Sequence, residues 1–212
     1  MSNNLQKGLE AALKLAPVVP VMVIENVKDA VPLARALVQG GLPVLEITLR
    51  TEAAFECIRA IVAEVEGAVI GSGTVLTPQQ LRDSRKAGCQ FAVSPGSTGK
   101  LLGAAGDEEI ALLPGAATAS EAMALLEWGY AIQKFFPAEP GGGVAYIGSL
   151  ASPLPQIKFC PTGGITAALA PSYLRLSNVI TVGGSWMIPK NLIAAADWAG
   201  IEKLARDAAS FK

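Results

Sequence analysis

The chain has 212 residues, of which 51% are hydrophobic and 17% are charged, and its formal net charge is −1. This length and composition predict one compact globular domain, residues 1–212, and exclude a disordered chain. The balanced charge excludes the clustered Lys and Arg surface that binds phosphate backbones, so we expect no nucleic-acid partner.

Histidine is absent from the sequence. Nucleophilic systems with an imidazole base and the usual catalytic zinc sites are therefore excluded, and no metal is expected. The three cysteines, Cys57, Cys89 and Cys160, lie far apart without metal-ligand spacing, which predicts reduced thiols and a cytoplasmic location. No apolar run reaches the ~20 residues of a membrane span, so no membrane association is expected.

From its start to Leu15 the chain reads as a polar segment followed by a short amphipathic helix. Short apolar, β-rich runs then alternate with longer segments of helical periodicity, and their starts are spaced by about 19 to 25 residues. The eight predicted strands are Val18 to Ile24, Pro43 to Leu49, Ala68 to Leu76, Phe91 to Gly96, Ile110 to Ala117, Ile132 to Ala138, Ile157 to Gly164 and Val179 to Trp186.

The intervening segments contain signals for helix ends. Thr77-Pro78 fits an N-cap followed by a first-turn proline, and Thr118 with Glu121 three residues later predicts a capping box. Glycines stand where helices should stop, at Gly40-Gly41, Gly88 and Gly129.

Strands that are apolar on both faces imply a parallel sheet covered by helices. Eight strand–helix units in one chain of this size predict an α/β fold, a single (β/α)8 TIM barrel with an N-terminal helix. A doubly wound open sheet is the alternative. In a barrel, functional residues are expected at the carboxyl ends of the strands.

Polar residues interrupt the second strand, where Glu46, Thr48 and Arg50 share the face that would point into the barrel. The sixth strand contains Lys134 between aliphatic and aromatic neighbours. Burial would disfavour the ammonium and leave a fraction of neutral amine, the form that attacks ketones. The alternative is a structural lysine that pairs with Glu46 or Glu139.

The seventh and eighth strands end in Thr162-Gly163-Gly164 and Gly183-Gly184-Ser185, each followed by possible helix-start residues. Barrels commonly bind phosphate at these two strand ends, with backbone N–H groups and the positive end of a short helix. Ordinary tight turns are the alternative. No histidine or clear cationic partner adjoins Cys160, which is expected to be a buried, unreactive thiol.

Six motifs occur in order along nearly the whole chain. They are Leu45-Glu46-Ile47-Thr48-Leu49-Arg50, Gly73-Thr74-Val75-Leu76, Ser94-Pro95-Gly96, Lys134-Phe135-Phe136-Pro137-Ala138-Glu139, Phe159-Cys160-Pro161-Thr162-Gly163-Gly164 and Gly183-Gly184-Ser185-Trp186. This set resembles the 2-keto-3-deoxy-6-phosphogluconate aldolases, also described as 4-hydroxy-2-oxoglutarate aldolases. The resemblance implies a (β/α)8 barrel that assembles as a homotrimer, needs no cofactor or metal, and acts on a small phosphorylated keto acid.

The resemblance also implies a role for individual residues. Lys134 would form the Schiff base with the substrate, and Glu46 would be the general acid/base. The implied substrate-binding residues are Arg50 and Thr74 for the carboxylate, Pro95 and Phe136 for the pocket wall, Thr162 for the hydroxyl region, and Gly163, Gly164, Gly184 and Ser185 for the phosphate.

The chain departs from the family pattern at Ser97 and at Ala116-Ala117, where the family often has bulkier apolar residues or Ile-Ser. These changes are expected to remove apolar bulk near the mouth of the barrel and affect the choice of aldehyde. Two alternatives stay open: an aldolase for the epimeric phosphogalactonate, and a non-catalytic phosphosugar-binding barrel in which Lys134 and Glu46 only pair.

Overall fold

The computed structural model describes residues 3–211, and within them the chain forms ten helices and nine strands. Every strand pairing is parallel, as predicted for a sheet built from strand–helix units. Each predicted run contains a strand. The strands are β1 (Val18–Met22), β2 (Val44–Thr48), β3 (Val69–Gly73), β4 (Phe91–Val93), β5 (Ala111–Leu113), β6 (Gly115–Ala116), β7 (Ile132–Phe135), β8 (Lys158–Pro161) and β9 (Val182–Gly184).

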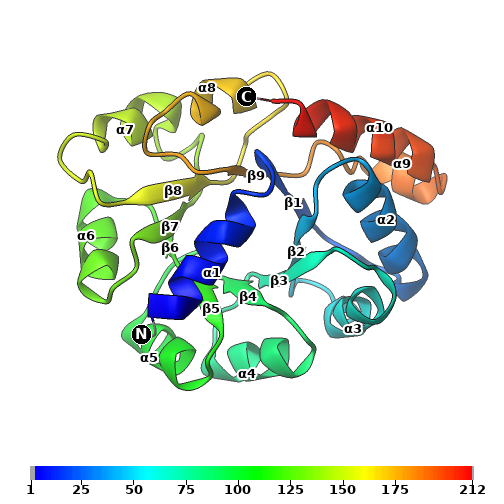
Figure 1. Cartoon of the computed structure of the whole chain (residues 1–212), viewed down its shortest axis with the longest axis horizontal. Coiled ribbons are helices and arrows are strands. Elements are labelled where there is room, and N and C mark those ends of the chain that lie inside the picture. The colour runs from blue at the N-terminus through cyan, green and yellow to red at the C-terminus, as the bar shows by residue number, and fades with distance from the viewer. Residues whose placement is uncertain (1–2, 212) are drawn as a thin grey trace.

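The helices lie around the outside of the strands, as Figure 1 shows. Strands and helices alternate along the chain from β1 to α9, with β5 and β6 as two parts of one predicted run. The helices are α1 (Asn3–Leu13), α2 (Val27–Gln39), α3 (Ala54–Glu64), α4 (Pro78–Lys86), α5 (Gly99–Asp107), α6 (Ala119–Glu127), α7 (Gly143–Ser149), α8 (Ala170–Leu174), α9 (Lys190–Ala194) and α10 (Trp198–Ala209).

The strands form two curled parallel sheets that meet at both ends. The first has the order β5-β4-β3-β2-β1-β9 and the second the order β6-β7-β8. Only Pro114 separates β5 from β6 in the chain. On the other side, isolated parallel bridges join Phe159 to Val179 and Thr162 to Gly183. The arrangement is an α/β fold with a curled parallel sheet, and no doubly wound strand order is present in the described residues.

Alternate residues of β2 belong to two different apolar clusters. Leu45 and Ile47 lie in the larger cluster between sheet and helices, whereas Val44 lies in a smaller cluster on the inner face of the curled sheet. The period of two therefore places Glu46 and Thr48 on the inner face, as predicted. The inner cluster also contains Leu9, Leu13, Val19, Phe91, Val93, Ala111, Leu113, Ile132 and Cys160.

Helix α1 lies across the strands in the centre of Figure 1. Its Leu9 and Leu13 are buried in the inner cluster, and a cavity beneath it is bordered by Val69 and Phe91, the first residues of β3 and β4. The helix therefore covers the amino ends of the strands. The carboxyl ends lie on the opposite side, where the functional residues were expected.

The predicted helix ends are confirmed. Thr77 and Thr118 each accept a hydrogen bond from the third residue of their helix, and both form full capping boxes. Gly41, Gly88 and Gly129 follow helices with φ values of 93°, 95° and 88°, a conformation that glycine adopts without a steric penalty.

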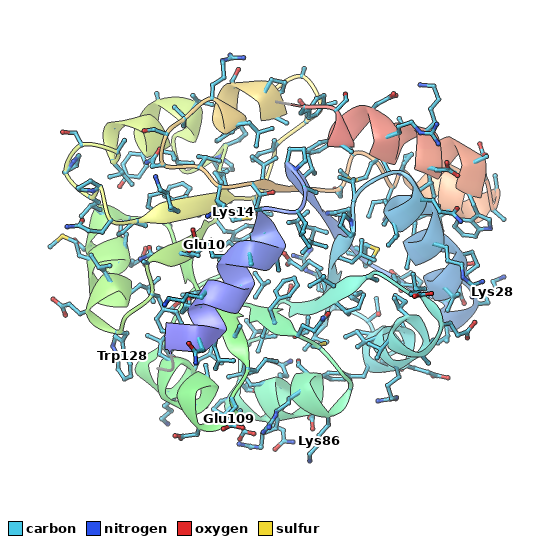
Figure 2. The ribbon with its side chains drawn as sticks, viewed as in Figure 1. Glu10, Lys14, Lys28, Lys86, Glu109 and Trp128 are labelled. Carbon is cyan, nitrogen blue, oxygen red and sulfur yellow. The ribbon has the colours of Figure 1, made fainter. Side chains whose placement is uncertain are left out.

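Charged side chains project from the outer elements, as Figure 2 shows for Lys28, Lys86 and Glu109. Glu10 on α1 and Lys14, the residue after this helix, form an exposed ion pair with Nζ and Oε1 2.6 Å apart. Within residues 3–211, no helix is both long enough and apolar enough to cross a membrane.

Candidate active site

A buried ion pair lies on the inner face of the sheet. Lys134 on β7 and Glu46 on β2 are 88 residues apart in sequence, yet Lys134 Nζ donates to Glu46 Oε1 at 3.2 Å. Each residue is only 3% exposed. Lys134 Nζ also lies 5.3 Å from the centre of the Phe136 ring, within the range of a cation–π contact. The amine is thus held against one carboxylate and one aromatic face, with little access to water.

Gly73, the last residue of β3, leaves room for the Glu46 side chain. It is paired in register with Thr48, and a Cβ at this position would lie 2.7 Å from Glu46 Cγ and 2.8 Å from Cδ. Any larger residue would displace the carboxylate. The sequence pattern assigned Gly73 no role, although an isolated glycine inside a strand often marks such a close approach.

Arg50 and Thr74 follow the ends of β2 and β3 and contact each other. Arg50 Nε donates to Thr74 Oγ1 at 3.0 Å. Thr74 has a φ of 58°, which is unusual and costly for a β-branched residue. The bond occupies Nε and fixes the guanidinium, whose terminal nitrogens are suited to a bidentate contact with a carboxylate.

A pocket of about 150 Å³ opens at the carboxyl ends of β8 and β9. It brings together Arg50, Phe136 and the two glycine turns that were expected to bind phosphate. Val21 and Ile165 also line it and were not anticipated. The complete lining is Val21, Arg50, Phe136, Thr162, Gly163, Gly164, Ile165, Gly183, Gly184 and Ser185.

The glycine turns present backbone groups rather than a helix end. Gly163 and Gly164 have φ values of 109° and 79°, so both need glycine. Ser185 is followed by a turn in which Ile188 N donates to Ser185 O at 3.1 Å. The helices α8 and α9 begin only at Ala170 and Lys190. The expectation of a helix directly after each turn was therefore wrong, because short loops intervene.

Cys160 lies on the inner face of β8, and Thr162 is the first residue after this strand. Thr162 Oγ1 is buried and, among the described residues, has no hydrogen-bonding oxygen or nitrogen within reach. Cys160 is paired in register with Lys134, so it does have a cationic neighbour. Burial nevertheless raises the pKa of the Cys160 thiol to about 12, against a smaller opposing effect of Lys134. The thiol is therefore protonated and unreactive, as expected.

Pro95 and Ser97 lie near the site but outside the pocket that Arg50 lines. The main chain of Pro95 packs so closely on Gly115 that a Cβ there would overlap it, and Gly115 is paired with Lys134. Ser97 Oγ donates to Gly115 O at 3.0 Å. Ala116 is paired with Phe135 near the carboxyl ends of the strands, but its side chain is buried in the larger cluster between sheet and helices.

Glu139 does not pair with Lys134. Its Oε1 instead accepts a hydrogen bond from Tyr173 Oη on α8. Of the two partners that the sequence allowed for Lys134, the structure shows Glu46. Within the described part of the chain, no three His, Cys, Asp or Glu side chains are arranged to hold a metal ion.

Comparison with known proteins identifies the family. Residues 9–204 match the aldolase family described as KDPG and KHG aldolase. KDPG is 2-keto-3-deoxy-6-phosphogluconate and KHG is 4-hydroxy-2-oxoglutarate. A curated relative from Escherichia coli K12, named KHG/KDPG aldolase, is 50% identical over 205 residues, which are 97% of this chain and 96% of the relative.

Two crystal structures agree closely with the fold. The 2-keto-3-deoxy-6-phosphogluconate aldolase of Zymomonas mobilis, solved with 3-phosphoglycerate, has a TM-score of 0.93 and 48% identity over 98% of this chain and 97% of that one. The KDPG aldolase of Legionella pneumophila, solved with pyruvate captured as a covalent carbinolamine intermediate, has a TM-score of 0.92 and 44% identity, covering 95% of this chain and 98% of its own. The protein described here belongs to the KDPG and KHG aldolase family.

Proposed function

We propose that this protein is a class I aldolase that cleaves 2-keto-3-deoxy-6-phosphogluconate (KDPG) to pyruvate and glyceraldehyde 3-phosphate. The same site would cleave 4-hydroxy-2-oxoglutarate (KHG) to pyruvate and glyoxylate. The observation that carries this proposal is the buried Lys134 amine, 3.2 Å from Glu46 Oε1, near a pocket lined by two glycine turns. A buried ion pair is a weak source of stability, so a chemical role accounts for this pair better than a structural one.

The reaction begins at Lys134. The neutral amine adds to the C2 ketone to give a carbinolamine, which loses water and becomes an iminium. Arg50 would bind the substrate carboxylate through its terminal nitrogens and so hold C2 near the amine. The covalent carbinolamine captured with pyruvate in the Legionella pneumophila aldolase supports this order of steps.

Cleavage follows when Glu46 removes the proton of the C4 hydroxyl, directly or through a water. The C3–C4 bond breaks, its electron pair moves toward the iminium nitrogen, and the aldehyde leaves with a new carbonyl at C4. The resulting enamine takes a proton at C3. Hydrolysis of the new iminium then releases pyruvate and regenerates the Lys134 amine.

The phosphate of the departing aldehyde would bind at the glycine turns. Gly163 and Gly184 supply backbone N–H groups and Ser185 supplies a hydroxyl at the pocket surface. Thr162, whose buried hydroxyl bonds to no oxygen or nitrogen among the described residues, would bind the substrate hydroxyl region. Phe136 and Pro95 would form the apolar walls beside Lys134.

The test is product release combined with covalent trapping. Pyruvate release is measured from KDPG, from its phosphogalactonate epimer and from KHG, and each reaction is repeated with borohydride. We expect the highest kcat/KM for KDPG and a reduced pyruvate adduct on the peptide that contains Lys134. A higher kcat/KM for the epimer would show that the protein is a phosphogalactonate aldolase instead. Tight phosphate binding without turnover or adduct would support the non-catalytic barrel instead.

We also infer that residues 1–212 form one closed (β/α)8 domain with an N-terminal helix. Counting β5 and β6 as one strand gives eight strands, and the bridges from Phe159 to Val179 and from Thr162 to Gly183 support closure between β8 and β9. Slow amide exchange at Ile180, whose N–H donates to Phe159 O at 3.0 Å, would be expected of a closed ring.

We also infer that the protein is a homotrimer and that it is located in the cytoplasm. Met123 and Trp128 on and after α6 are 52% and 49% exposed, which supports burial of this surface by another subunit. The three free cysteines suit a reducing compartment. Light scattering should give three times the 21.8 kDa chain mass.

A further inference from the structure

A carboxylate that the proposed reaction does not use lies directly behind the phosphate pocket. Glu139 follows the reactive lysine by five positions, and its carboxylate accepts a hydrogen bond from Tyr173 Oη. Tyr173 belongs to α8 and is fully buried. Burial, and then Glu139 itself, raise the pKa of the Tyr173 phenol, so the hydroxyl stays protonated and remains a donor.

Glu139 is bonded to the first glycine turn through its backbone. Glu139 N donates to Gly163 O at 3.0 Å, and the preceding Ala138 N donates to Thr162 O at 2.8 Å. The pairing of β7 with β8 thus continues past the strand ends to the turn that lines the pocket. Glu139 is therefore tied to Gly163 through the backbone.

The Glu139 side chain also packs on the second glycine of the turn. A Cβ at Gly164 would lie 2.8 Å from Glu139 Cβ and 3.0 Å from Cγ. Gly164 is therefore glycine for two reasons, its φ of 79° and the side chain that lies against it. The turn is held between the pocket on one side and Glu139 on the other.

We propose that the Glu139–Tyr173 hydrogen bond is a positioning device that holds the Gly163-Gly164 turn in its phosphate-binding conformation and thereby sets the preference for phosphorylated substrates. Tyr173 is buried on α8, beyond the loop that contains the turn, and Glu139 is bonded to the start of that turn. The bond therefore links both ends of the loop. Neither residue touches the reacting atoms, so both act through the backbone of the turn. This inference rests on the proposed phosphate site.

Steady-state kinetics of Tyr173→Phe and Glu139→Gln on KDPG and on KHG test the role of the bond. Loss of one hydrogen bond to a charged group corresponds to about tenfold in binding, so Tyr173→Phe should raise KM for KDPG about tenfold with little change in kcat. For KHG, which has no phosphate, kcat/KM should change less than about twofold. Glu139→Gln keeps an acceptor of similar shape and should lose only about threefold on KDPG.

Tyr130→Phe is the matched control. Tyr130 is also buried and donates one hydrogen bond, to Leu102 O at 3.5 Å, but it lies at the amino end of β7. This variant should keep the wild-type ratio of KDPG to KHG activity. Melting temperatures of all variants separate loss of stability from loss of selectivity.

The outcomes distinguish the inference from the proposed function. If the wild type prefers KDPG and Tyr173→Phe keeps that preference while its melting temperature falls, the bond only stabilises the fold and the inference is wrong. If Tyr173→Phe does not fold, Glu139→Gln decides, and an unchanged KDPG to KHG ratio overturns the inference. A wild type that cleaves neither substrate refutes the proposed function itself.

Discussion

The proposed site consists of two regions that recognise their ligand by different means. The floor, formed by Lys134 and Glu46, uses charged side chains that are 4% exposed and are anchored on strands β7 and β2. The rim, formed by the turns at Gly163 and Gly184, uses backbone groups that line the pocket and a hydroxyl on Ser185. Side-chain chemistry is concentrated in the floor, whereas recognition by the rim is spread over several weak donors.

This difference predicts how the two regions respond to substitution. A floor residue supplies a chemical step that nothing else replaces, so its loss should affect all substrates strongly. A rim residue supplies one of several hydrogen bonds to one substituent, and its loss should affect only substrates that have that substituent.

Lys134→Arg should have the largest effect, at least about a thousandfold in kcat on every substrate, because the nucleophile is removed while the positive charge is kept. Borohydride trapping with pyruvate should yield no adduct. Lys158→Arg is the control, since Lys158 Nζ is exposed and donates to Ser177 O at 2.7 Å. Comparable turnover by Lys134→Arg, or an adduct on another lysine, would contradict the proposed mechanism.

Gly73→Ala should disturb the floor without changing a reactive group. Its Cβ would overlap the Glu46 side chain, so we expect kcat to fall about tenfold or more on both substrates and stability to fall by about 1–3 kcal/mol. Gly103→Ala in α5 adds the same methyl group where no atom lies within 4 Å. Equal activities of the two alanine variants would show that catalysis does not depend on the exact position of the Glu46 carboxylate.

Ser185→Ala should have a small and selective effect on the rim. Removal of one hydroxyl should cost about 1 kcal/mol, or about fivefold in kcat/KM, for KDPG and nothing for KHG. Ser149→Ala, which removes an exposed hydroxyl bonded to Tyr146 O, is the control. An equal loss on both substrates would mean that Ser185 does not bind the phosphate.

Removal of metal ions should leave both catalysis in the floor and substrate binding at the rim unchanged. The iminium accepts the electron pair that a divalent ion accepts in metal-dependent aldolases, so a chelator should leave kcat unchanged on KDPG and KHG. Activity is measured after dialysis against EDTA, and again after addition of zinc or magnesium. Loss with the chelator and recovery with a metal would refute the class I assignment.

The sequence identified the floor more completely than the rim. Glu46 and Lys134 interrupt apolar strands with charge, and the period of two places Glu46 on the inward face of its strand, so both could be picked out as candidates without a structure. Their contact across 88 residues of sequence follows only from the curling of the sheet, which brings β2 and β7 to face each other.

The rim could be predicted only in part. Glycine pairs indicate turns, but they do not show which atoms the turns face. Loops also separate the two glycine turns from α8 and α9, whereas the sequence had suggested that a helix begins next to each turn. The partner of Glu139 was also missed, because Tyr173 stands 34 positions later on a helix of 5 residues with little periodic signal. Long-range contacts between side chains on loops and short helices have no counterpart in local sequence patterns.

The left-handed backbone of Thr74 places two selective pressures in opposition. A β-branched residue at a φ of 58° costs on the order of 1–3 kcal/mol, which Asn or Gly would largely avoid. Either replacement removes the hydroxyl that accepts from Arg50 Nε. Directed evolution for heat resistance alone should therefore enrich replacements of Thr74, whereas selection for growth that depends on catalysis should restore threonine.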